Sequence, residues 1–204
     1  MHHLFERGRD PLAPTLVLFH GTGGTERDLL PIAQHLSPSS SVLSLRGKVS
    51  ENGMARFFRR LSEGVFDEED LIFRTREVND FLTEAASTYG LDRSNFLAVG
   101  YSNGANIAGS LLFHHPGAFR GAIPHHPMVP RRGIPLPDLT GVPVFIGAGR
   151  NDPICSPQET EELGRMLQEA GAAVTVHWES NGHRLTPSEV DASADWLQAV
   201  ILEK

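Results

Sequence analysis

The chain has 204 residues, of which 40% are hydrophobic and 21% are charged, proportions that are typical of one globular domain with a sizeable core. Its formal net charge of −7 repels nucleic-acid phosphates and anionic lipids, so neither nucleic acid nor a membrane surface is an expected partner. The single cysteine excludes an internal disulfide, and no stretch has the length and apolarity of a signal peptide or a membrane span, so we expect one domain over residues 1–204 in the cytoplasm.

Short apolar segments predict the strands of a sheet. They lack the alternation of polar and apolar residues found in half-exposed strands, and continuous apolarity is typical of parallel strands that are covered on both faces. In chain order, these segments span residues 15–20, 42–45, 96–99, 121–123, 142–146 and 174–178.

Helices are predicted between the strands. Apolar residues recur at helical spacing in 78–85 and 163–170, and a glycine follows each segment as a stop. Capping boxes at 156–159 and 186–189 mark two helix starts, and the second opens a last helix expected to bury Val190, Ala194, Leu197 and Ile201. Strands that alternate with helices predict an α/β fold, with a mostly parallel sheet and helices on both faces.

Residues 47–67 show neither helical nor strand periodicity. The segment combines glycines, mixed charges and paired aromatic residues, so we expect an extended loop with about one helical turn. Because it follows the strand 42–45, one end should hang over the edge of the sheet where the parallel strands end. The segment is therefore a candidate lid.

Gly100-Tyr101-Ser102-Asn103-Gly104 lies between the predicted strand 96–99 and an apolar helical stretch, 105–113. A nucleophile elbow needs this context, because a sharp turn from strand to helix presents the serine oxygen above the sheet and glycines on each side avoid clashes. The helix N-terminus also favours developing negative charge. Ser102 is therefore the candidate nucleophile.

A serine hydroxyl needs a base to take its proton and a third group to orient that base. Asp152 and His183 follow the strands 142–146 and 174–178, and the chain order Ser, Asp, His is the one expected of this fold. An alternative acid is Glu179, with Asp152 acting as a cap for the next helix. Of the ten histidines, three others also lie at strand ends and are interpreted as pocket or turn residues: His20, His125 and His126.

Acyl transfer also requires donors to an oxyanion, usually two backbone N–H groups. We expect one from Asn103, directly after the nucleophile, and one from Thr22 in the turn His20-Gly21-Thr22-Gly23-Gly24. The alternative is that this turn cradles a phosphate. It lacks the Gly-Lys-Ser/Thr ending of a P-loop and the spacing of a dinucleotide fingerprint, which disfavours that alternative.

These motifs, with Asn151-Asp152-Pro153-Ile154 and Gly182-His183, resemble the signature blocks of the carboxylesterase/phospholipase family, which includes the acyl-protein thioesterases. The loop around Arg46-Gly47 and Arg56-Phe57-Phe58-Arg59 is similar to that of small bacterial esterases of quinone and hydroquinone stress. The resemblance implies an α/β-hydrolase without a separate cap domain, carboxylesterase activity on short acyl esters, and no cofactor. Asn103 and Ala105 replace the Gln and second Gly usual in the thioesterases, which argues against protein depalmitoylation.

The substrate pocket is less well defined by the sequence. Met54, Phe57 and Phe58 either form a pocket wall or anchor the loop to the core, and the arginines at 56, 59 and 60 either attract an anionic substrate or form a solvated face. His126 and Ile154 are further candidate substrate-binding residues. No metal site is expected, because a set made of His125, His126, Asp152 and His183 lacks the helical His spacing of a zinc hydrolase.

The expected function is that of a serine carboxylesterase acting on a small-molecule ester. The same three residues could instead serve a thioesterase, a lactone hydrolase or a hydrolase of ring-cleavage products. A non-catalytic small-molecule sensor on this fold is the remaining alternative, although a pure binder has no need of all three residues. A homodimer is left open by the sequence.

Overall fold

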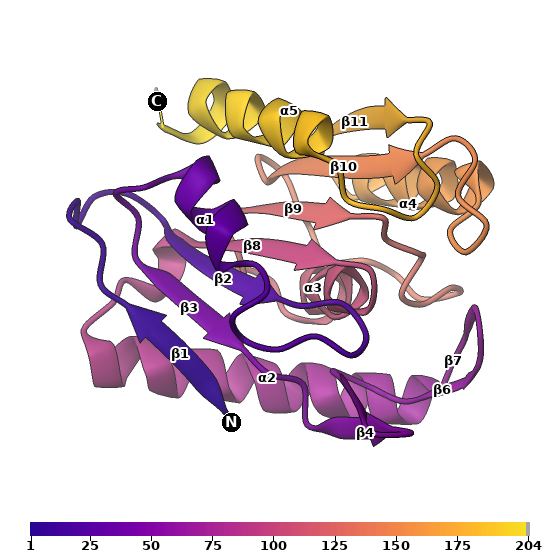
Figure 1. The fold of residues 1–204 in the computed structure, drawn as a ribbon, viewed down its shortest axis with the longest axis horizontal. Coiled ribbons are helices and arrows are strands. Elements are labelled where there is room, and N and C mark those ends of the chain that lie inside the picture. Colours follow the sequence, from indigo (N-terminus) through magenta and orange to yellow (C-terminus); the bar gives the residue numbers. More distant parts are fainter. Residues whose placement is uncertain (203–204) are drawn as a thin grey trace.

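The computed structural model describes residues 1–202, and the side chains of residues 1–200. Within that range, the main sheet has seven strands in the order β1-β3-β2-β8-β9-β10-β11 (Figure 1). Their bounds are β1 (His3–Glu6), β2 (Thr15–Phe19), β3 (Val42–Leu45), β8 (Phe96–Tyr101), β9 (Gly121–His125), β10 (Pro143–Gly149) and β11 (Ala173–Glu179). Neighbouring strands pair in parallel, except that β1 pairs with β3 in the antiparallel direction. The predicted mostly parallel sheet is confirmed.

All six predicted strands are present, with ends that shift by up to a few residues. Strand β1 was not predicted, because its four residues, His-Leu-Phe-Glu, form no continuous apolar run. Its position depends on tertiary contacts instead: Leu4 pairs with Ser44, and the Phe5 ring stacks on that of Tyr89 at a centroid distance of 4.1 Å. Such pairing partners lie far away in the sequence and leave no local signal.

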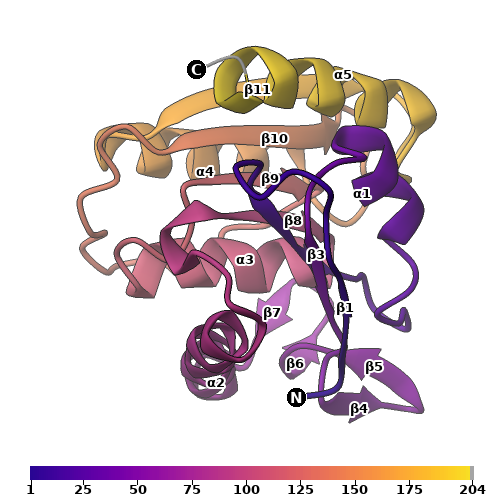
Figure 2. The ribbon, with the colours of Figure 1, turned by 90° about the vertical axis from the view of Figure 1, so that its left-hand side faces the viewer.

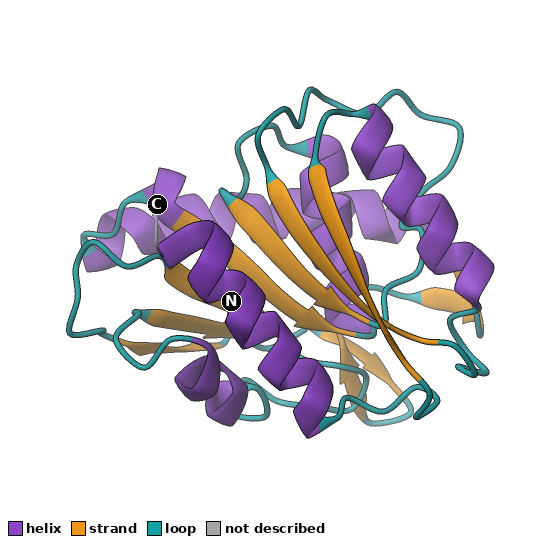
Figure 3. Ribbon diagram, turned by 90° about the horizontal axis from the view of Figure 1, so that it is seen from above, coloured by secondary structure: helices purple, strands orange, loops and turns teal. Residues whose placement is uncertain are grey.

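Helices cover both faces of the sheet, as predicted (Figure 3). One face carries α1 (Leu30–Leu36) and α5 (Pro187–Leu197), which share a core cluster with Leu16, Leu18 and Val99. The other carries α2 (Glu68–Tyr89), α3 (Asn103–His114) and α4 (Pro157–Glu169), which pack on Val17, Phe19 and Ile146. Alternate residues of β2 thus belong to opposite clusters, as the period of a strand requires. Within the described part of the chain, no helix has the length and apolarity to cross a membrane.

Residues 47–67, here called the hairpin segment, contain no helical turn, so that prediction was wrong. The segment forms one hairpin from β4 (Val49–Glu51) and β5 (Met54–Arg56) and another from β6 (Arg60–Ser62) and β7 (Val65–Phe66). Asn52 and Gly53 both have positive φ, 52° and 81°, which is the conformation that an Asn-Gly pair favours in a tight hairpin turn. The hairpins lie next to α2 (Figure 2), on the side of the molecule toward which the parallel strands point (Figure 1).

The last helix buries a different face from the one expected. Helix α5 fully buries Glu189, Ser193, Trp196 and Leu197, whereas Val190 and Ala194 are only half-buried. Of the expected buried residues Leu197 is therefore confirmed, and the side chain of Ile201 lies outside the described residues. The buried face of α5 therefore includes a carboxylate, that of Glu189, near the start of the helix.

Candidate active site

Ser102 occupies a strained turn between β8 and α3. Its φ of 53° and ψ of −116° are unusual for a residue other than glycine, and they turn the chain sharply from strand to helix. The neighbours leave no room for side chains: a Cβ on Gly100 would lie 2.7 Å from the Gly104 carbonyl oxygen, and one on Gly104 would lie 2.0 Å from the Phe19 oxygen. The predicted elbow geometry is therefore present, with both glycines required.

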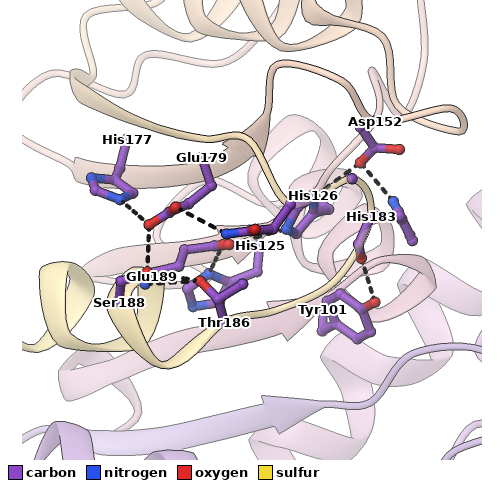
Figure 4. Close-up of polar contacts among 12 residues, drawn as sticks. Tyr101, His125, His126, Asp152, His177, Glu179, His183, Thr186, Ser188 and Glu189 are labelled. Atoms are coloured by element: carbon purple, nitrogen blue, oxygen red, sulfur yellow. Dashed lines mark hydrogen bonds and ion pairs between the residues drawn. The ribbon is translucent and has the colours of Figure 1, made fainter.

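The structure brings together the three residues that the sequence singled out from distant positions. Ser102 Oγ lies 2.8 Å from His183 Nε2, and His183 Nδ1 lies 2.7 Å from Asp152 Oδ2. Figure 4 shows the contact between Asp152 and His183, whose loops follow the neighbouring strands β10 and β11. Because a carboxylate only accepts, Nδ1 of His183 donates to Asp152 and leaves Nε2 to accept from the serine hydroxyl.

Asp152 is a buried carboxylate with acceptor bonds on both oxygens. Its Oδ1 accepts from the amides of Ile154 and Cys155 at 2.8 and 2.9 Å, and its Oδ2 accepts from His183 and from His126. Burial alone would raise the pKa of Asp152, but the amide and imidazole donors outweigh burial and hold the pKa below its ordinary value. This carboxylate therefore stays ionised and fixed in orientation.

Glu179, the alternative acid, faces a different set of partners. It accepts from His177 Nε2 at 3.0 Å and from Ser188 Oγ at 2.8 Å, while no hydrogen bond joins it to His183 among the described residues. The carboxylate that meets His183 is that of Asp152.

Two residues that the sequence did not single out hold the His183 loop. The Tyr101 hydroxyl donates to the His183 carbonyl oxygen at 2.6 Å, and the Gly182 amide donates to Asn151 Oδ1 at 2.9 Å. Tyr101 belongs to the elbow and Asn151 to the Asp152 loop, so each ties the histidine loop to another part of the site. Their positions within the motifs were the available signal, but their partners could not be assigned from the sequence.

The two predicted oxyanion donors come from different elements, the turn after β2 and the start of α3. Asn103 is the first residue of α3, where an amide has no acceptor within the helix. Thr22 lies in the turn after β2, and its hydroxyl accepts from Arg56 Nη1 at 2.6 Å while the next amide, of Gly23, donates to the Ala55 carbonyl at 2.9 Å. The hairpin segment thus holds the turn in place. Both residues line one cavity with Ser102 and His183.

That cavity has a volume of about 330 Å³. Of the predicted substrate-binding residues, Met54 and Ile154 line it and are partly exposed. The remaining residues that line the cavity were not predicted as substrate-binding residues: they are Arg56, Arg60, Glu63, Gly64, Phe66, Tyr101, Asn106, Met128 and Cys155. A larger hollow of about 540 Å³ adjoins it across Thr22 and Tyr101, but neither Ser102 nor His183 lines that hollow.

Phe57, Phe58 and His126 do not line the cavity, so their expected pocket positions are corrected. The Phe57 ring packs against Phe19 and the Phe58 ring against Phe66, at centroid distances of 5.5 and 5.0 Å, and both side chains are buried. They anchor the hairpin segment to the core, which was the alternative interpretation. His126 is buried behind Asp152 instead of facing the cavity.

The arginines of the hairpin segment divide between the two interpretations. Arg59 is an exposed residue paired with Asp67, as expected of a solvated face. Arg56 and Arg60 line the cavity, and both contact the carboxylate of Glu51, at 3.3 and 2.9 Å. Much of their positive charge is therefore compensated within the segment.

One group of side chains has the proximity of metal ligands. Ligand atoms of His126, Asp152 and His183 lie within 4.8 Å of one another in the described part of the chain. However, Nδ1 of His126 and Nδ1 of His183 both donate to Asp152 Oδ2. Their hydrogens, and not the lone pairs that a metal would need, therefore point toward the carboxylate. The proximity is that of a hydrogen-bonded relay.

Proteins of known sequence and structure match nearly the whole chain. MhqD of Bacillus subtilis (strain 168), a protein named as a hydrolase, is 54% identical over 202 residues, which are 99% of this chain and 100% of MhqD. The crystal structure of the Bacillus cereus carboxylesterase is 59% identical, with a TM-score of 0.97 over 98% of this chain and 94% of that one.

Two further structures share the fold at lower identity. A structure of YahD with malic acid is 32% identical, with a TM-score of 0.93 and 98% of each chain covered. A carboxylesterase from Mesorhizobium loti is 30% identical, with a TM-score of 0.87 over 93% of this chain and 90% of that one. The predicted resemblance to small bacterial carboxylesterases is confirmed. Residues 54–195 match the dienelactone hydrolase family, and since that match spans more than half of the sequence, this protein belongs to the dienelactone hydrolase family.

Proposed function

We propose that this protein is a serine carboxylesterase that hydrolyses small carboxylic esters through an acyl-serine intermediate. The observation that carries the proposal is the unbroken hydrogen-bonded series from Ser102 through His183 to Asp152, with distances of 2.8 and 2.7 Å. The similarity to the Bacillus cereus carboxylesterase, at 59% identity, supports the same function. The cytoplasm as its location and a small-molecule ester as its partner remain parts of this proposal.

The chemistry follows from the geometry. His183 Nε2 takes the hydroxyl proton as Ser102 Oγ attacks the ester carbonyl carbon, and the amides of Thr22 and Asn103 stabilise the oxyanion. His183 then gives that proton to the departing alcohol, leaving an acyl-serine. A water molecule, deprotonated by His183, attacks the acyl carbon, and the acid leaves while the proton returns to Ser102 Oγ.

The size of the cavity supports a small substrate. A volume of about 330 Å³ is at the lower end of ligand pockets. Met54, Phe66 and Ile154 provide an apolar lining for a short acyl chain or a compact alcohol. No separate cap domain is present in the described residues to enclose a longer chain.

Lactone hydrolysis is a second candidate, favoured by the name of the matching family. A lactone is an internal ester, so the same attack by Ser102 opens its ring, and the alcohol stays attached to the acid product. Comparing p-nitrophenyl acetate, p-nitrophenyl butyrate, an acyl thioester and a five-membered lactone at equal concentration would rank these bonds by kcat/KM.

The proposal is tested by Ser102→Ala. We expect hydrolysis of p-nitrophenyl acetate to fall by at least about 10³-fold, because the nucleophile is lost while binding and the oxyanion donors remain. Ser188→Ala, at an exposed serine, is the matched control and should keep full activity. Full activity in Ser102→Ala would refute the proposal. A fluorophosphonate probe separates an enzyme from a sensor, because only an activated serine reacts with it.

A further inference from the structure

A second layer of buried ionisable residues lies behind Asp152, on the side away from the cavity. His126 Nδ1 lies 2.9 Å from Asp152 Oδ2, and His126 Nε2 lies 3.0 Å from Glu189 Oε2 (Figure 4). The other carboxylate oxygen of Glu189 lies 2.5 Å from His125 Nδ1. The side chains of His126, Asp152 and Glu189 have no exposed surface. These three side chains are therefore out of contact with solvent.

His126 is held between two carboxylates. Each of its ring nitrogens faces a carboxylate oxygen, which can only accept, so each nitrogen carries a hydrogen and the ring is an imidazolium. Burial lowers the pKa of His126, but Glu189 and Asp152 outweigh burial and raise the pKa above its ordinary value. Burial likewise raises the pKa of Glu189, and the hydrogen bonds from His125 and His126 outweigh it and lower the pKa to about 2.

The backbone conformation and a glycine leave room for the buried side chains of His126 and Glu189. His126 has a φ of 53°, which is rare for a residue other than glycine and costs about 1 kcal/mol or more. Its amide donates to the Gly147 carbonyl at 2.7 Å, which fixes the ring under Asp152. A Cβ on Gly147 would lie 2.0 Å from Glu189 Oε1, so only glycine leaves room for that carboxylate.

Glu189 also departs from the role that its position suggests. As the third residue of α5, a glutamate in a capping box returns its carboxylate to the backbone amide of the N-cap residue, here Thr186. Here Thr186 Oγ1 accepts from the Glu189 amide at 3.3 Å, but the carboxylate turns inward to the two histidines. Burying an acid in this way costs free energy unless it is paired, and the pairing here is complete on both oxygens.

We propose that His126 and Glu189 are positioning residues for the esterase reaction, which hold Asp152 ionised and aligned with His183 and balance the charge that His183 acquires during catalysis. This inference rests on the proposed function. While His183 is neutral, the buried group of Asp152, Glu189 and His126 has two negative charges and one positive charge. Its net charge is therefore −1. The proton that His183 takes from Ser102 neutralises that charge, so the buried group favours the transition state over the resting state.

Besides the two carboxylates, three side chains lie against His126, those of Tyr101, Cys155 and His183, while His125 meets the other oxygen of Glu189. Tyr101 lies with its ring centroid 6.0 Å away, and burial, followed by the charge of Asp152, raises the pKa of its hydroxyl. Cys155 donates its thiol to the His126 carbonyl oxygen at 3.2 Å, and burial raises the pKa of that thiol. His183 is the remaining neighbour, with a centroid distance of 5.2 Å. The charge balance therefore depends on Asp152 and Glu189.

The test is the pH dependence of fluorophosphonate labelling at Ser102, which reports the protonation of His183 without requiring an ester substrate. In His126→Asn, which suits a positive φ, both carboxylates lose the cation between them. We expect the acidic limb of the labelling rate to move up by about one pH unit, because the extra negative charge favours protonated His183. We also expect the rate on the plateau to fall by about tenfold, because Asp152 loses a donor.

Adding Glu189→Gln to His126→Asn removes one negative charge, and we expect the limb to return most of the way to its wild-type position. A merely structural role would not produce this rescue. His177→Asn is the matched control, at a histidine that pairs with Glu179 outside the site, and its limb should not move. An unmoved limb in His126→Asn, or a double variant whose limb stays with that of the single variant, would overturn the inference.

A measurement on the unaltered protein covers the case in which a variant does not fold. The imidazole ¹⁵N signals of His126 should report a doubly protonated ring at about pH 7, where an ordinary histidine is mostly neutral. A neutral ring at that pH would contradict the charge balance. Failure of the proposed function is distinguishable, because wild-type protein would then not be labelled at any pH.

Discussion

The edge of the sheet and the hairpin segment contribute to the same cavity, but they differ in how their side chains are positioned. Ser102, Asp152 and His183 each follow a parallel strand, so the sheet itself brings them to one edge. In the hairpin segment, Met54 lines the cavity while Phe57, three residues later, is buried in the core. A parallel sheet therefore predicts the location of a side chain better than a short hairpin does.

The largest expected effect tests the edge of the sheet, where two acidic residues follow neighbouring strands. Asp152→Asn should lower kcat for p-nitrophenyl acetate by roughly 10³- to 10⁴-fold, because the amide can no longer hold His183 in the tautomer that accepts from Ser102. Glu179→Gln is the control and should stay within about twofold of wild type, since its side-chain partners are His177, Asn181 and Ser188 and not His183. The reverse result would assign the acid to Glu179.

The same comparison explains what could be predicted from the sequence. The six core strands were found because continuous apolar runs are a local signal, and the elbow because its glycines and its place between strand and helix are local too. The first hairpin also has a local signal, Asn52-Gly53, which indicates a tight turn where a helical turn was expected. Strand β1 had none, because its contacts with Ser44 and Tyr89 come from distant parts of the chain.

Polar residues that act at a distance were the hardest to predict. The capping-box pattern at 186–189 correctly marked the start of α5, yet it assigned the carboxylate of Glu189 to the helix instead of to His125 and His126. His126 was expected in the pocket because it follows a strand, as Ser102, Asp152 and His183 do. Its positive φ turns the ring beneath Asp152, and no sequence pattern predicts that turn.

The second expected effect tests the hairpin segment by separating its core residue from its cavity residue. Phe57→Ala should lower the free energy of unfolding by about 3 to 5 kcal/mol, because it leaves a void beside Phe19 and His20. Met54→Ala should lower it by less than about 1 kcal/mol, because Met54 is 40% exposed, but it should change KM by enlarging the cavity. Urea unfolding and p-nitrophenyl butyrate kinetics measure the two effects. Equal destabilisation by both would remove the distinction between the core and cavity residues.

The smallest expected effect concerns the pH dependence of stability. It compares Glu189, a carboxylate buried beneath the edge of the sheet, with Glu51, a half-exposed carboxylate of the hairpin segment. Because the folded pKa of Glu189 is about 2, below its ordinary value of 4.5, its contribution is complete above about pH 4.5 and is lost as the pH falls toward 2. The lowered pKa of Asp152 acts in the same direction, whereas the raised pKa of His126 contributes at low pH and is lost as the pH rises through its folded value.

Urea unfolding at about pH 6 and about pH 3 should therefore show a smaller loss of stability on acidification in Glu189→Gln than in wild type, by on the order of 2 kcal/mol. The matched control is Glu51→Gln, which removes the half-exposed partner of Arg56 and Arg60 and should change the acid dependence by less than about 1 kcal/mol. If both variants flattened the pH dependence equally, burial beneath the sheet edge would not distinguish Glu189 from a half-exposed carboxylate. The two expected changes in acid dependence differ because of desolvation. Glu189 and its histidine partners have lost their contact with water, so this carboxylate depends wholly on those partners, whereas Glu51 keeps part of its hydration.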